Sequence, residues 1–324
     1  MNTPTFMRAS LGNPLFVIAP VCLLLAVVLF SALQREFATT ANLGNITGQV
    51  SLLLLLSAGQ MVVMVNRGFD ISVGAVAALS STVAALAVNQ FGTAGLAMGV
   101  LAGATLGLLN GVLVAYLGVQ PIIATLGSLL AARALARLIS DDGQAIVVQG
   151  NSILSALSES SWIGAPPLFW LSAGSLVGLG LVLYRTAMGR RLFMCGSNPH
   201  AAALIGVSVA RSTCLAYLLC GTMAGLGGIA VLSRSGAGLP TEGAGLELQS
   251  IAAALIGGTA LAGGSGSLIA TAAGAFFIQT IMTGLNLIGV APFIAQILFG
   301  MLIIGSGFLE KLTHRFFNHH QGLQ

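Results

Sequence analysis

Stretches of about 20 mostly apolar residues, the length that a helix needs to cross a membrane, recur along this chain. A transmembrane β-barrel would instead show short segments in which apolar and polar residues alternate. The pattern therefore predicts an all-α membrane protein with about ten transmembrane helices, built as a single transmembrane domain over residues 1–324. The predicted segments are Leu15 to Leu33, Gln49 to Asn66, Ile71 to Val88, Ala94 to Leu117, Pro121 to Ile139, Leu168 to Tyr184, Ser212 to Leu232, Leu248 to Ala262, Leu268 to Leu287 and Pro292 to Leu309.

The composition agrees with a membrane protein and excludes the soluble classes. Of the 324 residues, 56% are hydrophobic and 6% are charged, and the mean hydropathy is +0.98. Soluble proteins carry about a quarter charged residues. The first apolar run, Pro14 to Leu33, is long enough to span, so we expect it to be retained as the first helix. The segment Leu248 to Ala262 contains Gly257 and Gly258, and it either spans fully or forms a half-helix.

Positive charges orient the chain. Short loops rich in Lys and Arg stay on the cytoplasmic side, and the internal loop 185–211 gathers several arginines between two apolar segments. They are Arg185, Arg190, Arg191 and Arg211. With about ten crossings and Arg8 inside, this loop and the basic C-terminal tail fall on one side, which predicts cytoplasmic N- and C-termini. Arg35, Arg133 and Arg137 then lie toward the outer side, against the rule.

One polar loop provides most of the predicted outer surface. Residues 140–166 carry Asp141, Asp142 and Glu159 and would form the largest extracytoplasmic loop. We expect a molecule that arrives from outside the membrane to dock there.

The 185–211 loop also contains the signals of a short helix. Asn is a strong N-cap residue, Pro suits the first turn, and Gly is a common stop after the last turn. Residues of these types stand in that order around an Ala-rich run: Asn198, Pro199, His200, Ala201, Ala202, Ile205 and Gly206. A transporter that an external motor pushes needs such an exposed piece, with Arg190 and Arg191 beside it. On these features alone, an ordinary connecting loop is the simpler interpretation.

A charged pair interrupts two apolar segments, with almost no loop between them, in the string Arg67-Gly68-Phe69-Asp70-Ile71-Ser72. Asp70 can cap a helix that begins at Ile71 by accepting backbone N–H groups, and Ser72 can support the same turn. A tight turn between helices is the simpler interpretation. Ionisable residues near membrane depth are candidates for function, so contact of Arg67, Asp70 or Ser72 with a transport path is the alternative.

The sequence carries no residue pattern typical of an enzyme, a cofactor site or a metal site. The run Gly257 to Gly266 lacks the Lys-Ser/Thr ending of a nucleotide-binding loop, so we expect no ATP hydrolysis by this chain. No Ser/His/Asp triad stands out, and the histidines lack ligand spacing. The net charge of +4 is spread along the chain, which argues against nucleic acid as a partner. The strings Gly103 to Gly111 and Gly221 to Gly228 favour close packing of helices.

Four strings, taken in order, resemble one family. They are Arg67-Gly68-Phe69-Asp70-Ile71-Ser72-Val73-Gly74, Gln120-Pro121-Ile122-Ile123-Ala124-Thr125-Leu126-Gly127, Thr186-Ala187-Met188-Gly189-Arg190 leading to Gly196-Ser197-Asn198-Pro199-His200-Ala201-Ala202, and Gly257-Gly258-Thr259 followed by Gly263-Gly264-Ser265-Gly266. Together they resemble the permease subunits of ATP-binding cassette importers of the ribose type, in the branched-chain amino acid and ribose permease superfamily. The likeness runs from about Gln49 to Gly307. One departure is that the family usually has Gly-Gly-Ile-Asp where this chain has Arg67 to Asp70.

The resemblance implies a multi-pass protein of the bacterial inner membrane, surrounded by membrane lipid, that pairs with a second permease subunit as a homodimer or heterodimer. It implies a periplasmic sugar-binding protein that delivers the solute, and a separate cytoplasmic ATP-binding subunit that holds ATP and Mg. The helix from Asn198 to Ile205 would be the coupling helix on which this ATPase docks. The aqueous path would lie at the interface of the two permease subunits.

The sequence thus predicts the permease of an ATP-driven monosaccharide importer, with a path that suits a neutral, hydroxylated solute because very few charges would line it. Nucleosides and furanosyl signalling molecules are alternative solutes within the family. An ion-coupled secondary transporter, a different class, would need intramembrane carboxylates or unwound half-helices, and Glu247 is the only acidic candidate. A membrane-embedded enzyme would need a catalytic set of residues at one membrane depth.

Overall fold

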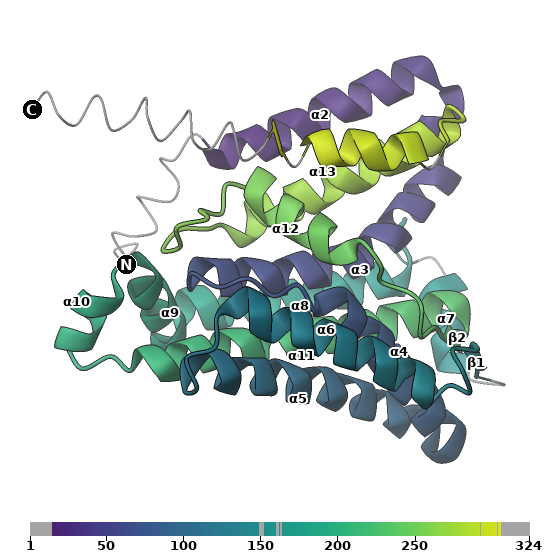
Figure 1. The fold of residues 1–324 in the computed structure, drawn as a ribbon. Helices are drawn as coiled ribbons and strands as arrows, with labels where there is room; N and C mark the ends of the chain where they lie inside the picture. The colour runs from purple at the N-terminus through teal and green to yellow at the C-terminus, as the bar shows by residue number, and fades with distance from the viewer. Residues whose placement is uncertain are drawn as a thin grey trace, which may run out of the picture.

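The computed structural model describes residues 15–148, 152–159, 162, 164–291, 293–302 and 304–305. Within them the chain is almost entirely helical (Figure 1). The long helices are α2 (Leu15–Leu33), α3 (Thr40–Val65), α4 (Val73–Phe91), α5 (Gly95–Ala115), α6 (Pro121–Leu138), α8 (Pro167–Arg185), α11 (Val209–Ser235) and α13 (Leu268–Leu287). The shorter ones are α7 (Ser152–Glu159), α9 (Ala187–Ser197), α10 (Pro199–Leu204) and α12 (Leu246–Ile256), with the 3-10 turns η1 (Arg35–Ala38) and η2 (Gly92–Ala94).

Each predicted apolar segment overlaps a helix, although α12 ends at Ile256 and not at Ala262. α2 and α13 have the predicted bounds, whereas α3 begins earlier, at Thr40, because the Thr39 side chain caps it by accepting a hydrogen bond from the N–H of Asn42 at 3.3 Å. Among the described residues, six apolar helical stretches are long enough to cross a membrane, and one of them, Val73–Ala115, consists of α4 and α5 joined by η2. The last predicted segment is helical over Phe293–Leu302. Arg8 and the basic C-terminal tail lie outside the described residues.

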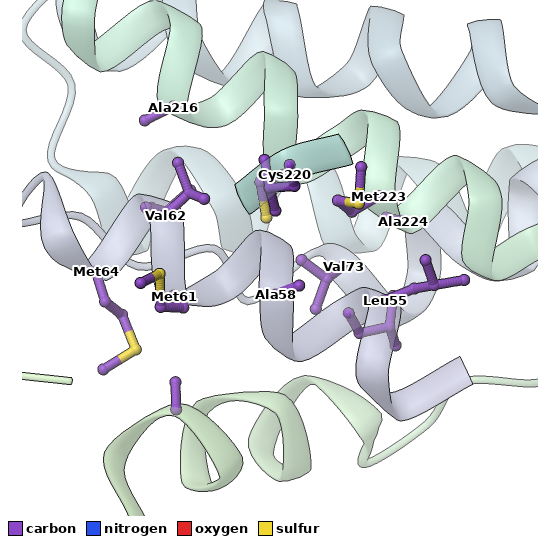
Figure 2. Close-up of a cluster of buried hydrophobic side chains, with 14 of the residues drawn as sticks. Leu55, Ala58, Met61, Val62, Met64, Val73, Ala216, Cys220, Met223 and Ala224 are labelled. Atoms are coloured by element: carbon purple, nitrogen blue, oxygen red, sulfur yellow. The ribbon is translucent and has the colours of Figure 1, made fainter. Parts of the chain in front are cut away.

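The helices form two groups on either side of α3. α2, α12 and α13 lie on one side, and α4, α5, α6, α8 and α11 lie on the other (Figure 1). Every α3 side chain from Val50 to Val65 is buried, as expected for a helix that is apolar all round. Figure 2 shows the core between α3 and α11, where Val62 of α3 lies near Cys220 of α11, and Met223 of α11 lies near Ala58 and Leu55 of α3.

Glycines let α5 approach its neighbours closely. They recur at every fourth position and so share one face of the helix: Gly95, Gly99, Gly103, Gly107 and Gly111. A Cβ on Gly103 would lie 2.5 Å from the carbonyl oxygen of Gly221 in α11, and one on Gly111 would lie 2.8 Å from that of Cys214. The two predicted small-residue strings are therefore confirmed as a packing surface, and the order of these contacts shows that α5 and α11 run antiparallel.

The loops gather at two opposite ends of the bundle (Figure 1). At the end that we call the α10 end, α9 and α10 lie between α8 and α11, and the N–H of Leu268 at the start of α13 donates to the Tyr184 hydroxyl at the end of α8, at 3.0 Å. At the other end, which we call the β end, β1 (Ile146–Val147) pairs antiparallel with β2 (Ala237–Gly238).

α12 is a half-helix. It has 11 residues, which at 1.5 Å per residue gives about 16 Å, roughly half of the thickness of the hydrocarbon core. The segment before it lies against α4: a Cβ on Gly238 would lie 2.8 Å from the Cβ of Ala85, and one on Gly243 would overlap the backbone of Gly74. The segment between the β end and the α10 end therefore consists of an irregular half, with turns over residues 240–245, and a helical half, which answers the question that the sequence left open.

Candidate functional site

α10 is the short helix that the sequence predicted in the basic loop, and its capping signals are confirmed. The side chain of Asn198 accepts a hydrogen bond from the N–H of Ala201 at 3.0 Å, and Pro199 occupies the first turn. Gly206 follows the helix with a φ of +81°, a backbone conformation that glycine adopts readily. These local signals fix where the helix begins and ends.

The tip of α10 is apolar and exposed. Ala202 is buried, whereas Leu204 is 89% exposed and Ile205 is 66% exposed. Arg190 and Arg191 are also exposed, on α9. Large apolar side chains on a protruding helix end are typical of a contact surface for another protein.

Arg67 fastens the turn after α3 to the end of α9. Its Nε donates to the carbonyl oxygen of Gly196 at 2.5 Å, and its Nη2 donates to that of Ser197 at 2.7 Å. The last carbonyls of a helix have no partner within the helix, and its dipole favours a cation there. To reach them, Arg67 adopts a left-handed φ of +65°, which is uncommon for a residue other than glycine.

Further contacts join the turn after α3 to the end of α9, and we call this region the α10 junction. The N–H of Gly264 donates to the carbonyl oxygen of Val65 at 2.8 Å, and the Thr213 hydroxyl of α11 donates to the side-chain oxygen of Asn66 at 2.8 Å. A Cβ on Gly196 would overlap the Val65 carbonyl group, so only glycine fits there. The base of α10 is thus held against the ends of α3 and α11 and against the Gly-rich loop 257–266.

Asp70 is buried where the chain turns back along α3, with 1% of its surface exposed. Its Oδ1 accepts hydrogen bonds from the N–H of Ser72 at 2.9 Å and from the Ser72 hydroxyl at 2.5 Å. The Gln60 side chain faces the Asp70 backbone and, in one of its two amide orientations, bonds the C=O at 2.9 Å and the N–H at 3.3 Å. The Tyr217 hydroxyl donates to the Phe69 carbonyl at 3.1 Å. After the end of α3 the chain therefore folds back along that helix, over more than one of its turns, and α4 begins inside the bundle.

The polar network continues into α5 and α6. Nδ2 of Asn110 donates to the Ser72 hydroxyl at 3.1 Å, and the Ser128 hydroxyl donates to Oδ1 of Asn110. Asn110 is fully buried in α5, whereas Ser128 lies half-buried on α6. Neither residue was predicted from the sequence, although the single amide inside the glycine stripe of α5 is a signal for a buried polar contact.

An ion pair joins α6 to α12. Nη2 of Arg133 lies 3.2 Å from Oε1 of Glu247, across 114 residues of sequence. The contact between these two residues could not be predicted, because no local pattern links residues so far apart in the chain.

The structure divides the predicted site residues into two sets. Arg67 belongs with the α10 junction, whereas Asp70 and Ser72 belong to the buried network. Asp70 accepts a hydrogen bond from a backbone N–H, that of Ser72, as predicted, but the prediction that it caps a helix beginning at Ile71 is wrong. α4 begins at Val73 with Ser72 as its N-cap residue, because Ile71 and Ser72 are still part of the turn that Asp70 holds. α9 was not predicted as a separate helix.

The run Gly257 to Gly266 connects α12 to α13, and its glycines serve close backbone packing. A Cβ on Gly257 would lie 2.6 Å from the Cα of Thr271, and one on Gly264 would lie 2.7 Å from the Cα of Ser197. Within the described part of the chain, no three His, Cys, Asp or Glu side chains are grouped in a way that suits a metal ion.

Comparison with known proteins gives consistent matches over most of the chain. Residues 42–307 match the family model of the branched-chain amino acid transport system / permease component. The chain is 31% identical to the ribose import permease protein RbsC of Escherichia coli (strain K12), over 88% of this chain and 90% of that protein. It is 31% identical to the L-arabinose transport system permease protein AraH of the same organism, over 86% of this chain and 85% of that protein.

A third relative is the autoinducer 2 import system permease protein LsrC of Klebsiella pneumoniae, which is 34% identical over 91% of this chain and 86% of that protein. No solved structure matches the chain. The family model covers well over half of the chain, and each of the three relatives is covered over most of its length. The chain therefore belongs to the family of branched-chain amino acid transport system permease components.

Proposed function

We propose that this chain is the permease subunit of an ATP-driven importer that carries a monosaccharide across the bacterial inner membrane. The observation that carries the proposal is the arrangement of α10. This helix is capped at its start, exposes apolar side chains at its tip, and is fixed at its base by Arg67. A force applied to α10 reaches the turn after α3 through Arg67 and Gly264. The ribose and L-arabinose permeases among the relatives support a sugar as the solute.

We infer about ten crossings, with both termini in the cytoplasm. The arginines at the α10 end favour the cytoplasm as the side on which this end lies. In this topology α12 and the non-helical segment before it make one crossing together, as discontinuous helices do in other transporters. The helix Phe293–Leu302 would begin the last crossing and lead the chain back toward the α10 end.

Two cytoplasmic ATP-binding subunits would dock on the α10 helices of a permease pair, and they would hold ATP and Mg²⁺. The second permease subunit would be another copy of this chain or a related chain. ATP binding and hydrolysis would change the distance between the two α10 helices, and the pair would open its path to each side in turn. This chain would hold no cofactor of its own.

The β end would receive a periplasmic sugar-binding protein. Asp141 and Asp142 are exposed there, with left-handed φ values of +52° and +58°, in the loop that leads to β1. Exposed carboxylates suit basic side chains on the docking protein. The Glu159 side chain lies outside the described residues.

The solute would be neutral and rich in hydroxyl groups. The one acidic residue that the sequence offered as an ion site, Glu247, is paired with Arg133, so its charge is compensated. This pairing speaks against an ion-coupled transporter, which needs a carboxylate that is free to bind the cation. The relative named for autoinducer 2 makes a furanosyl signalling molecule the second candidate solute.

Co-purification tests the role of α10. We would express the chain with its candidate ATPase in a bacterial membrane and compare the wild type with Leu204→Glu and Ile205→Glu, which leave Asn198, Gly206 and the base of α10 unchanged. The matched control is Val147→Glu, an exposed apolar residue at the β end. We expect the ATPase to be lost at least tenfold from the two α10 variants only. Equal recovery of the ATPase with all variants would remove α10 as its docking site.

A further inference from the structure

α4 and α12 both begin inside the bundle, at the same level. The turn that holds Asp70 brings the chain back along α3 before α4 starts at Val73. The segment before α12 descends along α4 from the β end until Gly243 lies against Gly74, and α12 starts at Leu246. Two helix N-termini therefore meet beside the same group, the carboxylate of Glu247.

The Glu247 carboxylate is bonded to Arg133 through one oxygen and lies against the start of α4 with the other. Oε1 lies 3.2 Å from Nη2 of Arg133, while Oε2 is buried and has no hydrogen-bond partner within the described chain. A Cβ on Gly74 would lie 2.7 Å from this Oε2, so the carboxylate sits on the first turn of α4. The positive end of that helix stabilises the negative charge. Glu247 is thus fixed, and it directs the guanidinium group of Arg133.

Arg133 reaches the surface at this depth. Its side chain is 33% exposed, against 11% for that of Glu247. Only its Nη2 is bonded within the part of the chain that the structure describes, so other N–H donors of the guanidinium group remain available. A charge that faces lipid near the middle of the membrane is costly, and such residues face a bundle interior or a water-filled cavity instead.

The backbone next to the Arg133–Glu247 pair also indicates a water-filled cavity. Residues 239–245 are not helical, and Thr241, Glu242 and Ala244 are exposed. Non-helical backbone at membrane depth is stable only where protein covers it or where it lines a water-filled cavity. A dry contact with a second subunit would leave the free donors of Arg133 without acceptors, which costs free energy. Water and hydroxyl groups supply such acceptors.

We propose that Arg133, held by Glu247, lines the transport route and binds the hydroxyl groups of a neutral, polyhydroxylated solute as it passes. The inference rests on the proposed function and specifies a contact within that route. Hydroxyl groups of a sugar accept hydrogen bonds from the guanidinium group and donate to Oε1 of Glu247. The pair carries no net charge, so it neither attracts nor repels ions strongly, and a neutral solute leaves it readily.

Transport by reconstituted protein tests this contact. The chain, its ATPase and its binding protein are placed in proteoliposomes, and uptake of D-ribose, L-arabinose and D-allose is measured, the sugar that the wild type imports being the probe. We expect Arg133→Gln to lower uptake at least tenfold, with co-purification of the ATPase and its ATP hydrolysis within twofold of the wild type. Arg137→Gln, one turn further along α6 and exposed, is the matched control and stays within twofold in uptake. Normal uptake by Arg133→Gln, with a working wild type, overturns this inference and leaves the proposed function standing.

Water access gives a second measurement that needs no transported sugar and separates a route from a structural ion pair. In a chain whose four cysteines are replaced by alanine, Arg133→Cys and Leu130→Cys are treated with a charged, membrane-impermeant thiol reagent. Leu130 is 67% exposed on the same helix and serves as the lipid-facing control. We expect Arg133→Cys to react at least tenfold faster than Leu130→Cys, and an excess of the imported sugar to slow its reaction. Equal rates would show that Arg133 faces no aqueous route.

Discussion

Nε of Arg67 donates a hydrogen bond to the carbonyl oxygen of Gly196 at 2.5 Å, and this contact joins the turn after α3 to the helix that leads into α10. The same segment contains Asp70, and the hydrogen bonds that begin at Asp70 reach α5 and α6. Residues 65–72 therefore connect the base of α10 to the buried polar groups of the bundle, and we expect a displacement of α10 to be passed through this short segment.

Replacing Arg67 tests this link. In Arg67→Ala two hydrogen bonds to the end of α9 are lost, and because the side chain is exposed we expect a loss of only about 1 kcal/mol in the free energy of unfolding. The larger effect falls on coupling: the ratio of sugar imported to ATP hydrolysed in proteoliposomes drops several-fold, while the ATPase remains bound. Arg211→Ala, an exposed arginine at the same end, keeps the ratio of the wild type. An unchanged ratio in Arg67→Ala would show that the contact is not used in coupling.

The hydrogen bonds of Asp70 predict that two substitutions of this residue differ in how much they lower the free energy of unfolding. Asp70→Ala leaves the N–H and hydroxyl of Ser72 without their acceptor in a buried site, and we expect a loss of about 2 to 4 kcal/mol in the free energy of unfolding. Asp70→Asn keeps an oxygen at the Oδ1 position and loses less. Denaturant titration of the detergent-solubilised chain measures both. A larger loss in Asp70→Asn than in Asp70→Ala would contradict the bonding that we describe.

The glycine face of α5 predicts a position-specific effect of one methyl group. In Gly103→Ala the added Cβ meets the backbone of Gly221 at 2.5 Å, and overpacking of this kind costs about 1 to 3 kcal/mol. Gly174→Ala is the control, because a Cβ there meets nothing within 4 Å. Thermal unfolding midpoints in detergent should fall for the first variant and stay level or rise for the second. Equal midpoints would mean that α5 and α11 do not pack through these glycines.

Those features that local chemistry determines could be predicted from the sequence. The bounds of α2 and α13 follow from apolar length, and those of α10 follow from Asn198, Pro199 and Gly206. Each of these signals acts within a few residues, so one stretch of sequence contains all of it.

Features that depend on contacts between distant residues could not be predicted. Asn110 and Ser128 meet because α5 and α6 pack side by side, and Arg133 meets Glu247 because α12 begins inside the bundle. The link from Arg67 to Gly196 was missed for the same reason, because it spans 129 residues and needs an unusual backbone conformation at Arg67. Such pairs depend on how the helices are packed, which hydropathy does not encode.

The most direct test of the central claim is to measure which source of energy drives sugar uptake. The chain is reconstituted with its candidate ATPase and binding protein, and uptake of labelled D-ribose, L-arabinose or D-allose is followed with ATP supplied on the side of α10 or with an imposed proton or sodium gradient. The account predicts accumulation that requires ATP on that side, persists when ion gradients are collapsed, and disappears in Leu204→Glu. Accumulation driven by an ion gradient in the absence of any ATPase would contradict it.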